Sequence, residues 1–138
     1  MNRPFDDQRQ PRVRLESEAI LLILQKLHQR EWEWIGSEVL LYELEQTNNA
    51  ELKERLLLLA KQMHKVIETT EKILAQAEKL ESSGFDGYDA IHLVSAEHGK
   101  VDIFLTTDDN IQKVSNRNKK MFSFIVTNPV KWLEEVLK

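Results

Sequence analysis

The stretch GYDAIHLVSAEHGKVDIFLTTD, residues 87–108, decides the fold class of this 138-residue chain. Its first half, Tyr88–Glu97, carries apolar residues at the spacing of a buried helix, and Gly99 is of a type that commonly stops helices. Its second half, Val101–Thr106, is the best strand in the chain because it is rich in β-branched and aromatic residues. A buried helix that leads into a buried strand is typical of an α/β domain.

The same alternation continues on both sides of this stretch. After a polar loop from Met1 to Pro11, the pattern predicts helices at Arg14–Gln29, at Glu38–Gln46 with Ser37 as cap, around Leu52 to Met63, from a cap at Thr69 or Thr70 to Leu80, around Ile111 to Val114, and from Pro129 onward. It predicts short strands at Trp32–Ile35, Lys65–Glu68 and Phe122–Val126. We therefore expect a single domain over residues 1–138, of the three-layer α/β/α type with a parallel sheet.

Composition narrows the class of protein. The formal net charge is -4, so bulk charge does not indicate a nucleic-acid binder, and contact with phosphate needs a local basic patch or cations held by acidic residues. The absence of cysteine excludes disulfides, thiolate zinc sites and cysteine nucleophiles. The longest apolar run, Ala19–Leu24, is too short to cross a bilayer, and Met1–Pro4 is no signal peptide. We expect a soluble, cytoplasmic protein that does not contact membranes.

Three acidic residues fall where an open parallel sheet gathers its ligands, beyond the carboxyl ends of strands. Asp108 follows the Val101–Thr106 strand, Asp89 lies in the first turn of its helix, and Glu43 projects from the helix after the Trp32–Ile35 strand. Carboxylates that converge repel one another, and a hard divalent cation such as Mg²⁺ or Mn²⁺ compensates the repulsion. Each acid also has a purely structural interpretation, as a helix cap, a dipole partner or a solvated side chain.

The remaining polar and aromatic candidates have weaker patterns. His92 shares a helix face with Asp89, where packing or hydrogen bonding is favoured over metal ligation because hard cations prefer oxygen. The run Arg117–Lys120 is typical of a solvated loop, although it could also meet an RNA backbone. The three tryptophans could stack on bases, but their positions favour the core; they are Trp32, Trp34 and Trp132.

Four segments together resemble PIN domains. Ser37–Leu44 is similar to the family's second acidic motif, and Gly87–Ala96 is similar to its Asp-Ala-hydrophobic-His helix. Asp102–Asp108 is similar to its strand that ends in Thr-Thr-Asp, and Val126–Val130 is similar to its closing strand-to-helix turn. In addition, Asn2–Asp7 resembles the loop that one bacterial subgroup carries directly after its first strand. The resemblance spans essentially the whole chain, with the segments in the family's order.

The resemblance implies a parallel sheet of about five strands, a Mg²⁺ or Mn²⁺ site and cleavage of single-stranded RNA. It points to ribonucleases of the VapC-like toxin type, which are inhibited by a small antitoxin protein and are often homodimers. Carried over residue by residue, Glu43, Asp89 and Asp108 become catalytic acids that hold the metal. Thr106 becomes a supporting polar neighbour that could orient a carboxylate or water.

The chain departs from the family pattern at its start. In PIN domains the loop like Asn2–Asp7 follows a hydrophobic strand that ends in an aspartate and lies in the centre of the sheet, whereas here Met1 precedes it directly. Asp6 and Asp7 lie on the far side of the loop and are poor substitutes. Either the natural protein is longer, which we favour because no other motif looks decayed, or the chain is truly shortened.

Two alternatives to the enzyme follow. Without the first aspartate, the chain could be a non-catalytic PIN-fold module that binds RNA or a partner protein. The apolar helices between Ala50 and Leu80 could also form a protein-binding scaffold, although such faces more often form core or a homodimer seam.

Overall fold

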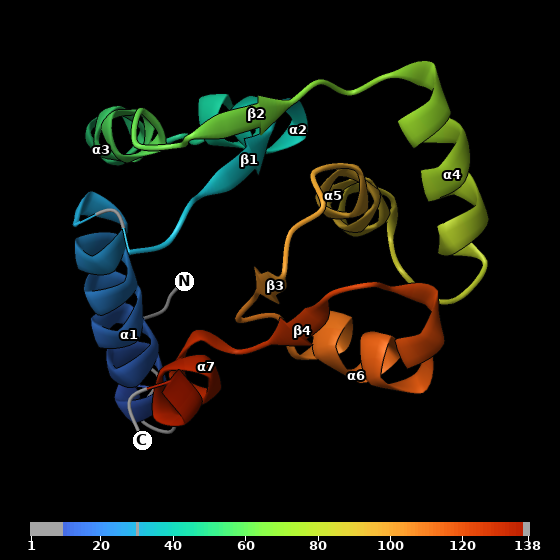
Figure 1. The fold of residues 1–138 in the computed structure, drawn as a ribbon. Helices are drawn as coiled ribbons and strands as arrows, with labels where there is room; N and C mark the ends of the chain where they lie inside the picture. Colours follow the sequence, from blue (N-terminus) through green and yellow to red (C-terminus); the bar gives the residue numbers. More distant parts are fainter. Residues whose placement is uncertain (1–9, 30, 137–138) are drawn as a thin grey trace.

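The computed structural model describes residues 10–29 and 31–136, so the predictions for Asn2–Asp7, and for Asp6 and Asp7 in particular, lie outside the described residues. The described part is a mixed α/β fold in which parallel strands alternate with helices, as the sequence predicts (Figure 1). The elements in chain order are α1 (Gln10–His28), β1 (Ile35–Ser37), α2 (Glu38–Glu45), α3 (Ala50–Ala60), β2 (Lys65–Ile67), α4 (Glu71–Glu81), α5 (Gly87–His98), β3 (Ile103–Leu105), α6 (Asp109–Arg117), a short 3-10 turn at Lys119–Met121, β4 (Ile125–Thr127) and α7 (Pro129–Val136).

Side chains just before the helices fix where these begin. The Ser37 hydroxyl accepts a hydrogen bond from the Leu40 amide at 3.2 Å, which confirms the predicted cap of α2. Thr70 caps α4 in the same way, which decides between the two threonines that the sequence left open. Asp86 caps α5 and Asn49 caps α3, and neither cap was predicted. Each cap satisfies a backbone donor that the first helical turn leaves without an intrahelical partner.

The strands are shorter than the sequence predicts, and three of them begin later. The first strand was expected at Trp32–Ile35 but occupies Ile35–Ser37, while Val101–Thr106 shortens to Ile103–Leu105. The last strand begins at Ile125 instead of Phe122. Strand propensity depends on residue type alone, whereas a strand in a structure also needs a hydrogen-bonded neighbour. Each of these strands is short because it has a described partner on one side only.

The end of α5 also differs from the sequence-based expectation. Gly99 stops the helix as predicted, but its backbone stays in the right-handed region with φ -78°. The left-handed residue is Lys100, with φ 54°. After α4, by contrast, Gly84 has φ +111°, a conformation that L side chains rarely adopt.

The sheet is divided into two parallel pairs, β1 with β2 and β3 with β4. The family resemblance implied about five strands in one sheet; within the described residues there are four, and no strand joins the two pairs. In Figure 1, β1 and β3 are the inner strands of the two pairs, and β2 and β4 are the outer ones. Among the described residues, no strand therefore occupies the central position that the family resemblance implies.

Main-chain hydrogen bonds show which side of each inner strand is unpaired. The Trp34 carbonyl accepts from the His64 amide at 2.8 Å, and the Thr106 amide donates to the Thr127 carbonyl at 2.9 Å. Alternate residues of a parallel strand direct these groups to opposite sides. Ile103 therefore directs its backbone groups away from β4, toward an edge where no described strand pairs with it.

Helix α5 contacts β1 of one strand pair and leads directly into β3 of the other pair. Its C-terminal Gly99 lies against Ile35 at the start of β1, where an added Cβ would come within 3.0 Å of Ile35 Cγ2. The chain then enters β3 a few residues after α5 ends. Both inner strands start near the C-terminal end of α5, and the segments that follow them reach its N-terminal half, through Glu43 and His92 after β1 and through Asp108 and Asp89 after β3. The carboxyl ends of both strands therefore lie toward the N-terminal half of α5.

The core lies between α5, α4 and the inner faces of both strand pairs. Ala90 and Leu93 of α5 have no exposed surface, and Ile73 of α4 is 1% exposed. Burial of a side chain such as Leu93 stabilises the fold by about 1.5–3 kcal/mol. The other fully or largely buried members of this cluster come from most elements between β2 and β4: Ile67, Ala77, Leu80, Phe85, Val94, Ile111, Val114 and Phe124.

Candidate functional site

The three acids predicted from the sequence lie at the edge of the fold where β1 and β3 end. Glu43 is on α2, directly after β1 in the chain; Asp89 is in the first turn of α5; and Asp108 is the N-cap of α6, shortly after β3. Because α5 runs opposite to both inner strands, its first turns lie at the strands' carboxyl ends. Segments far apart in the sequence therefore bring acidic side chains into one region.

Glu43 is linked to α5 through His92. The Nε2 atom of His92 makes a short hydrogen bond with Oε1 of Glu43, and the His92 side chain is 18% exposed. This contact joins α2 to α5 one turn beyond Asp89. The sequence favoured a hydrogen-bonding role for His92 over metal ligation, and the observed contact agrees with that interpretation. The contact uses Oε1 of Glu43 and not Oε2.

Asp89 sits in an electrostatic environment that disfavours its charge. Burial, followed by the negative charges of Asp86 and Asp108, raises its pKa to about 6, and nearby His92 partly offsets this rise. Asp86 was not anticipated as part of the site. A sequence signal existed, since an aspartate three residues before Asp89 is a typical N-cap, and Asp86 Oδ1 indeed accepts from the Asp89 amide at 3.2 Å.

Asp108 is held by its neighbours in the turn after β3. The Thr106 hydroxyl accepts a hydrogen bond from the Asp108 amide at 3.0 Å, so Thr106 orients this turn. Asp108 Oδ1 in turn accepts from the amides of Asn110 at 2.8 Å and Ile111 at 3.3 Å. The structural interpretation of Asp108 as a helix cap is therefore correct, and it occupies only one carboxylate oxygen. The second oxygen takes no part in the cap.

Arg12 of α1 holds the same turn from the other side, which the sequence did not indicate. Its guanidinium donates to both carboxylate oxygens of Asp109, at 2.7 and 2.8 Å, and to the Thr107 carbonyl at 3.1 Å. This pairing lowers the pKa of Asp109 and raises that of Arg12. A fork-like arginine contact with a carboxylate fixes orientation. The ion pair with Arg12 thereby offsets the charge of Asp109.

The available donors fit a hard divalent cation in their chemistry. Glu43, Asp89 and Asp108 each offer a carboxylate oxygen, and burial together with the charges of Asp86 and Asp108 raises the pKa of Asp89. Over residues 10–29 and 31–136, however, no three His, Asp or Glu side chains are close enough together to hold an ion. The region thus has suitable ligands, but the described residues do not form a closed metal cage.

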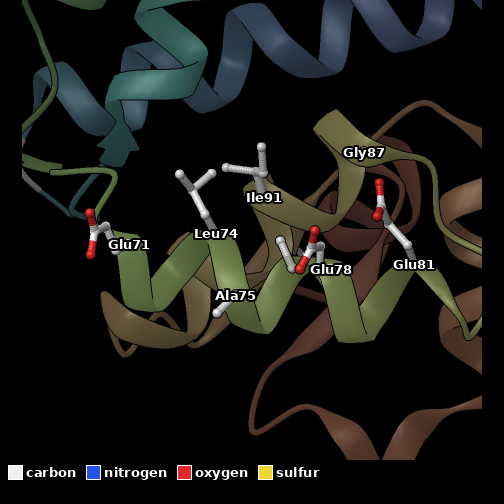
Figure 2. A pocket seen from close by; sticks show the side chains of 8 residues that line it. Glu71, Leu74, Ala75, Glu78, Glu81, Gly87 and Ile91 are labelled. Atoms are coloured by element: carbon white, nitrogen blue, oxygen red, sulfur yellow. The ribbon is translucent and has the colours of Figure 1, made fainter.

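A groove with a volume of about 480 Å³ lies elsewhere, between α4 and α5. Figure 2 shows glutamates spaced along α4, with Leu74 of α4 and Ile91 of α5 between them. A helix turns 100° per residue, so Ile91 and Asp89 point about 160° apart on α5. The groove is therefore separate from the acidic region.

Other candidates from the sequence are located away from the acids or have structural contacts. Trp32 and Trp132 pack on each other, with ring centroids 6.0 Å apart, and both are half-buried. The basic run Arg117–Lys120 spans the end of α6 and the 3-10 turn, with Arg117, Lys119 and Lys120 exposed. No helix among the described residues is both long and apolar enough for a transmembrane span.

Comparison with known protein families identifies the fold. The family model of the PIN domain matches residues 13–117, which is more than half of the chain, so the chain belongs to the PIN-domain family. PIN domains are a family of nucleases that generally use divalent metal ions. Comparisons with curated proteins and with solved structures gave no match. The matched region contains all the acids described above.

Proposed function

We propose that this protein is a metal-dependent endoribonuclease that cleaves single-stranded RNA. The observation that carries the proposal is that acids from three elements lie near the N-terminal half of α5, although the described residues form no closed metal cluster. Glu43 is tied to α5 by His92, and Asp89 interacts with the charge of Asp108. Membership of a nuclease family supports phosphodiester cleavage as the reaction of these acids.

The chain's own residues divide into ligands and positioning groups. Glu43, Asp89 and Asp108 would hold Mg²⁺ or Mn²⁺, which would supply positive charge to the phosphodiester and lower the pKa of a nearby water. His92 orients Glu43 through their hydrogen bond. The Thr106 hydroxyl orients the turn that contains Asp108, because it accepts a hydrogen bond from the Asp108 amide. No side-chain nucleophile is needed, because water attacks the phosphorus.

Cleavage of a labelled single-stranded RNA in Mg²⁺, Mn²⁺ or EDTA tests the proposal. We expect activity with either metal, none in EDTA, and strong loss in Asp89→Asn and Asp108→Asn. Asparagine caps helices as well as aspartate does, so the second variant keeps the α6 cap and removes only the charge. Asp102→Asn, at the opposite end of β3, is the matched control and should retain activity. Cleavage that survives in EDTA or in Asp89→Asn contradicts the metal mechanism.

We further propose a biological role as the toxin of a toxin–antitoxin pair, with a small antitoxin protein as inhibitor and with a homodimer as the active assembly. Family membership supports this role. Induced expression in a bacterial host should arrest growth, and expression of Asp89→Asn at the same level should not. Equal growth arrest by both forms contradicts a toxin that acts through RNA cleavage.

One observation favours a second candidate function, a PIN-fold module that binds RNA or protein without cleaving. Within the described residues the sheet is split between β1 and β3, and no three ligand side chains surround a common point. Saturable RNA binding in EDTA, together with no cleavage in Mg²⁺ or Mn²⁺, would select the module. Metal-dependent cleavage selects the enzyme.

A further inference from the structure

Two exposed tyrosines flank the acidic region. Tyr42 directly precedes Glu43 on α2, and Tyr88 directly precedes Asp89 on α5. Their rings stack on one another with centroids 6.4 Å apart and an interplanar angle of 26°. The contact crosses from α2 to α5, as the Glu43–His92 hydrogen bond does. The tyrosine pair, Tyr42 and Tyr88, therefore lies beside the acids.

The tyrosine pair is not part of the core. Tyr42 is 52% exposed and Tyr88 is 48% exposed, whereas the phenylalanines that contact one another between α5 and β4 are mostly covered. Glu43 is close to the pair, since its charge adds to a rise in the pKa of Tyr88 that Tyr42 and burial mainly cause. Stacked aromatic rings that remain half exposed leave a flat apolar surface in water, next to the acids.

A flat aromatic surface suits an unpaired nucleobase better than any other part of a nucleic acid. Stacking of a base on an aromatic ring is strong and tolerates any base, because every base has a π face. It requires a base that is free of its complementary strand, so it selects single-stranded RNA. The acids beside the pair, in contrast, repel the phosphate backbone unless cations are present.

We propose that Tyr42 and Tyr88 form a stacking platform for an unpaired base of single-stranded RNA next to the acidic region. The proposal rests on the proposed ribonuclease function and adds the element that positions the substrate. Base stacking holds the strand, and the neighbouring acids receive the adjacent phosphate. The platform favours binding without regard to base identity.

Fluorine NMR tests the platform directly, because these two tyrosines are the only ones in the chain. Uniform labelling with 3-fluorotyrosine gives two signals, both from the platform. We add oligoadenylate in EDTA, so that no cleavage occurs, and compare it with an abasic ribose-phosphate chain of the same length. We expect both signals to shift with oligoadenylate and to shift much less with the abasic chain. Equal shifts with the two ligands, or none with either, overturn the proposal.

Variants separate stacking from structure. Loss of one stacked base should weaken RNA binding about tenfold or more in Tyr42→Ala and in Tyr88→Ala, with rescue by phenylalanine at either position. Leu58→Ala, a similarly exposed apolar side chain on α3, is the matched control and should bind normally. In Mg²⁺ the alanine variants should raise KM more than they lower kcat. Normal binding by both alanine variants contradicts the platform.

The outcomes also distinguish this proposal from the ribonuclease itself. Base-dependent shifts without any cleavage leave the platform in place and reject the nuclease. Metal-dependent cleavage that is indifferent to Tyr42 and Tyr88 supports the nuclease and rejects the platform.

Discussion

Replacement of Asp89 by asparagine should stabilise the metal-free protein at neutral pH. Asp89 has a pKa raised to about 6 from 3.8, because burial and the charges of Asp86 and Asp108 disfavour its ionised form. Between these two pH values the folded state binds more protons than the unfolded state, so stability falls as pH rises. An asparagine side chain keeps the shape of the aspartate and never ionises. The variant therefore escapes this loss.

The size of the effect follows from the shift. Full expression of the rise in pKa would correspond to roughly 3 kcal/mol, since one pKa unit is worth about 1.4 kcal/mol. Asp89 is only partly buried, so solvent screening reduces the effect to about 1 kcal/mol. The stability that protonated Asp89 contributes is complete below pH 3.8 and is lost as pH rises to about 6. The advantage of Asp89→Asn should thus be near zero at pH 4 and about 1 kcal/mol at pH 7.5.

Urea unfolding of both proteins in EDTA, at several pH values between 4 and 7.5, measures this difference. Asp102→Asn, which removes one charge at the other end of β3, controls for the change in net charge. Addition of Mg²⁺ at pH 7.5 should then stabilise the wild-type protein and leave Asp89→Asn unchanged. The reasoning is refuted if Asp89→Asn is less stable than wild type at pH 7.5, or if the difference between them does not vary with pH.

Three further predictions concern the scaffold. Leu93→Ala should lower the free energy of unfolding by about 2–5 kcal/mol, because Leu93 is fully buried in the core. Chemical denaturation measures this loss, and a smaller loss contradicts the burial of Leu93. Gly84→Ala should cost about 1 kcal/mol or more, because φ +111° is unfavourable for alanine; an unchanged thermal midpoint would count against this conformation. In hydrogen exchange, the backbone amides of Ile103 and Leu105 should exchange faster than the amide of Phe104, which points toward β4. Slower exchange at Ile103 and Leu105 than at Phe104 would show that the other edge of β3 is paired.

Helix positions were largely predictable from the sequence, because caps and apolar spacing are local signals. Ser37 and Pro129 marked the starts of α2 and α7 correctly, and the buried face of α5 was evident from its apolar spacing. The alternation of helices with strands then gave the α/β class. These features depend on residues within one or two turns of each other.

Strand limits and the division of the sheet were less predictable, because both depend on distant partners. Trp32–Ile35 has the composition of a strand, yet only Ile35 belongs to β1, where pairing with Lys65 begins. The family resemblance predicted that no central strand joins the two pairs within the described residues, whereas composition alone did not. A strand without neighbours on one side has fewer bonds to extend it.

The three candidate acids stay a prediction from the sequence, whereas the contacts around them could not be predicted. Glu43, Asp89 and Asp108 could be proposed from their order along the chain, and Asp86 could have been recognised as a cap. The contact of Arg12 with Asp109 joins residues 97 positions apart, and no local sequence pattern predicts such a contact. The stacking of the tyrosine pair likewise appears only when α2 and α5 are placed together.

Binding of Mn²⁺ tests most directly whether acids from separate elements share one ion. The electron paramagnetic resonance signal of free Mn²⁺ reports the fraction that the protein has bound. We predict one bound ion per chain for wild type and for Asp102→Asn, and strongly reduced binding for Glu43→Gln, Asp89→Asn and Asp108→Asn. Unchanged binding in these three variants, or no binding by the wild-type protein, would contradict the shared site.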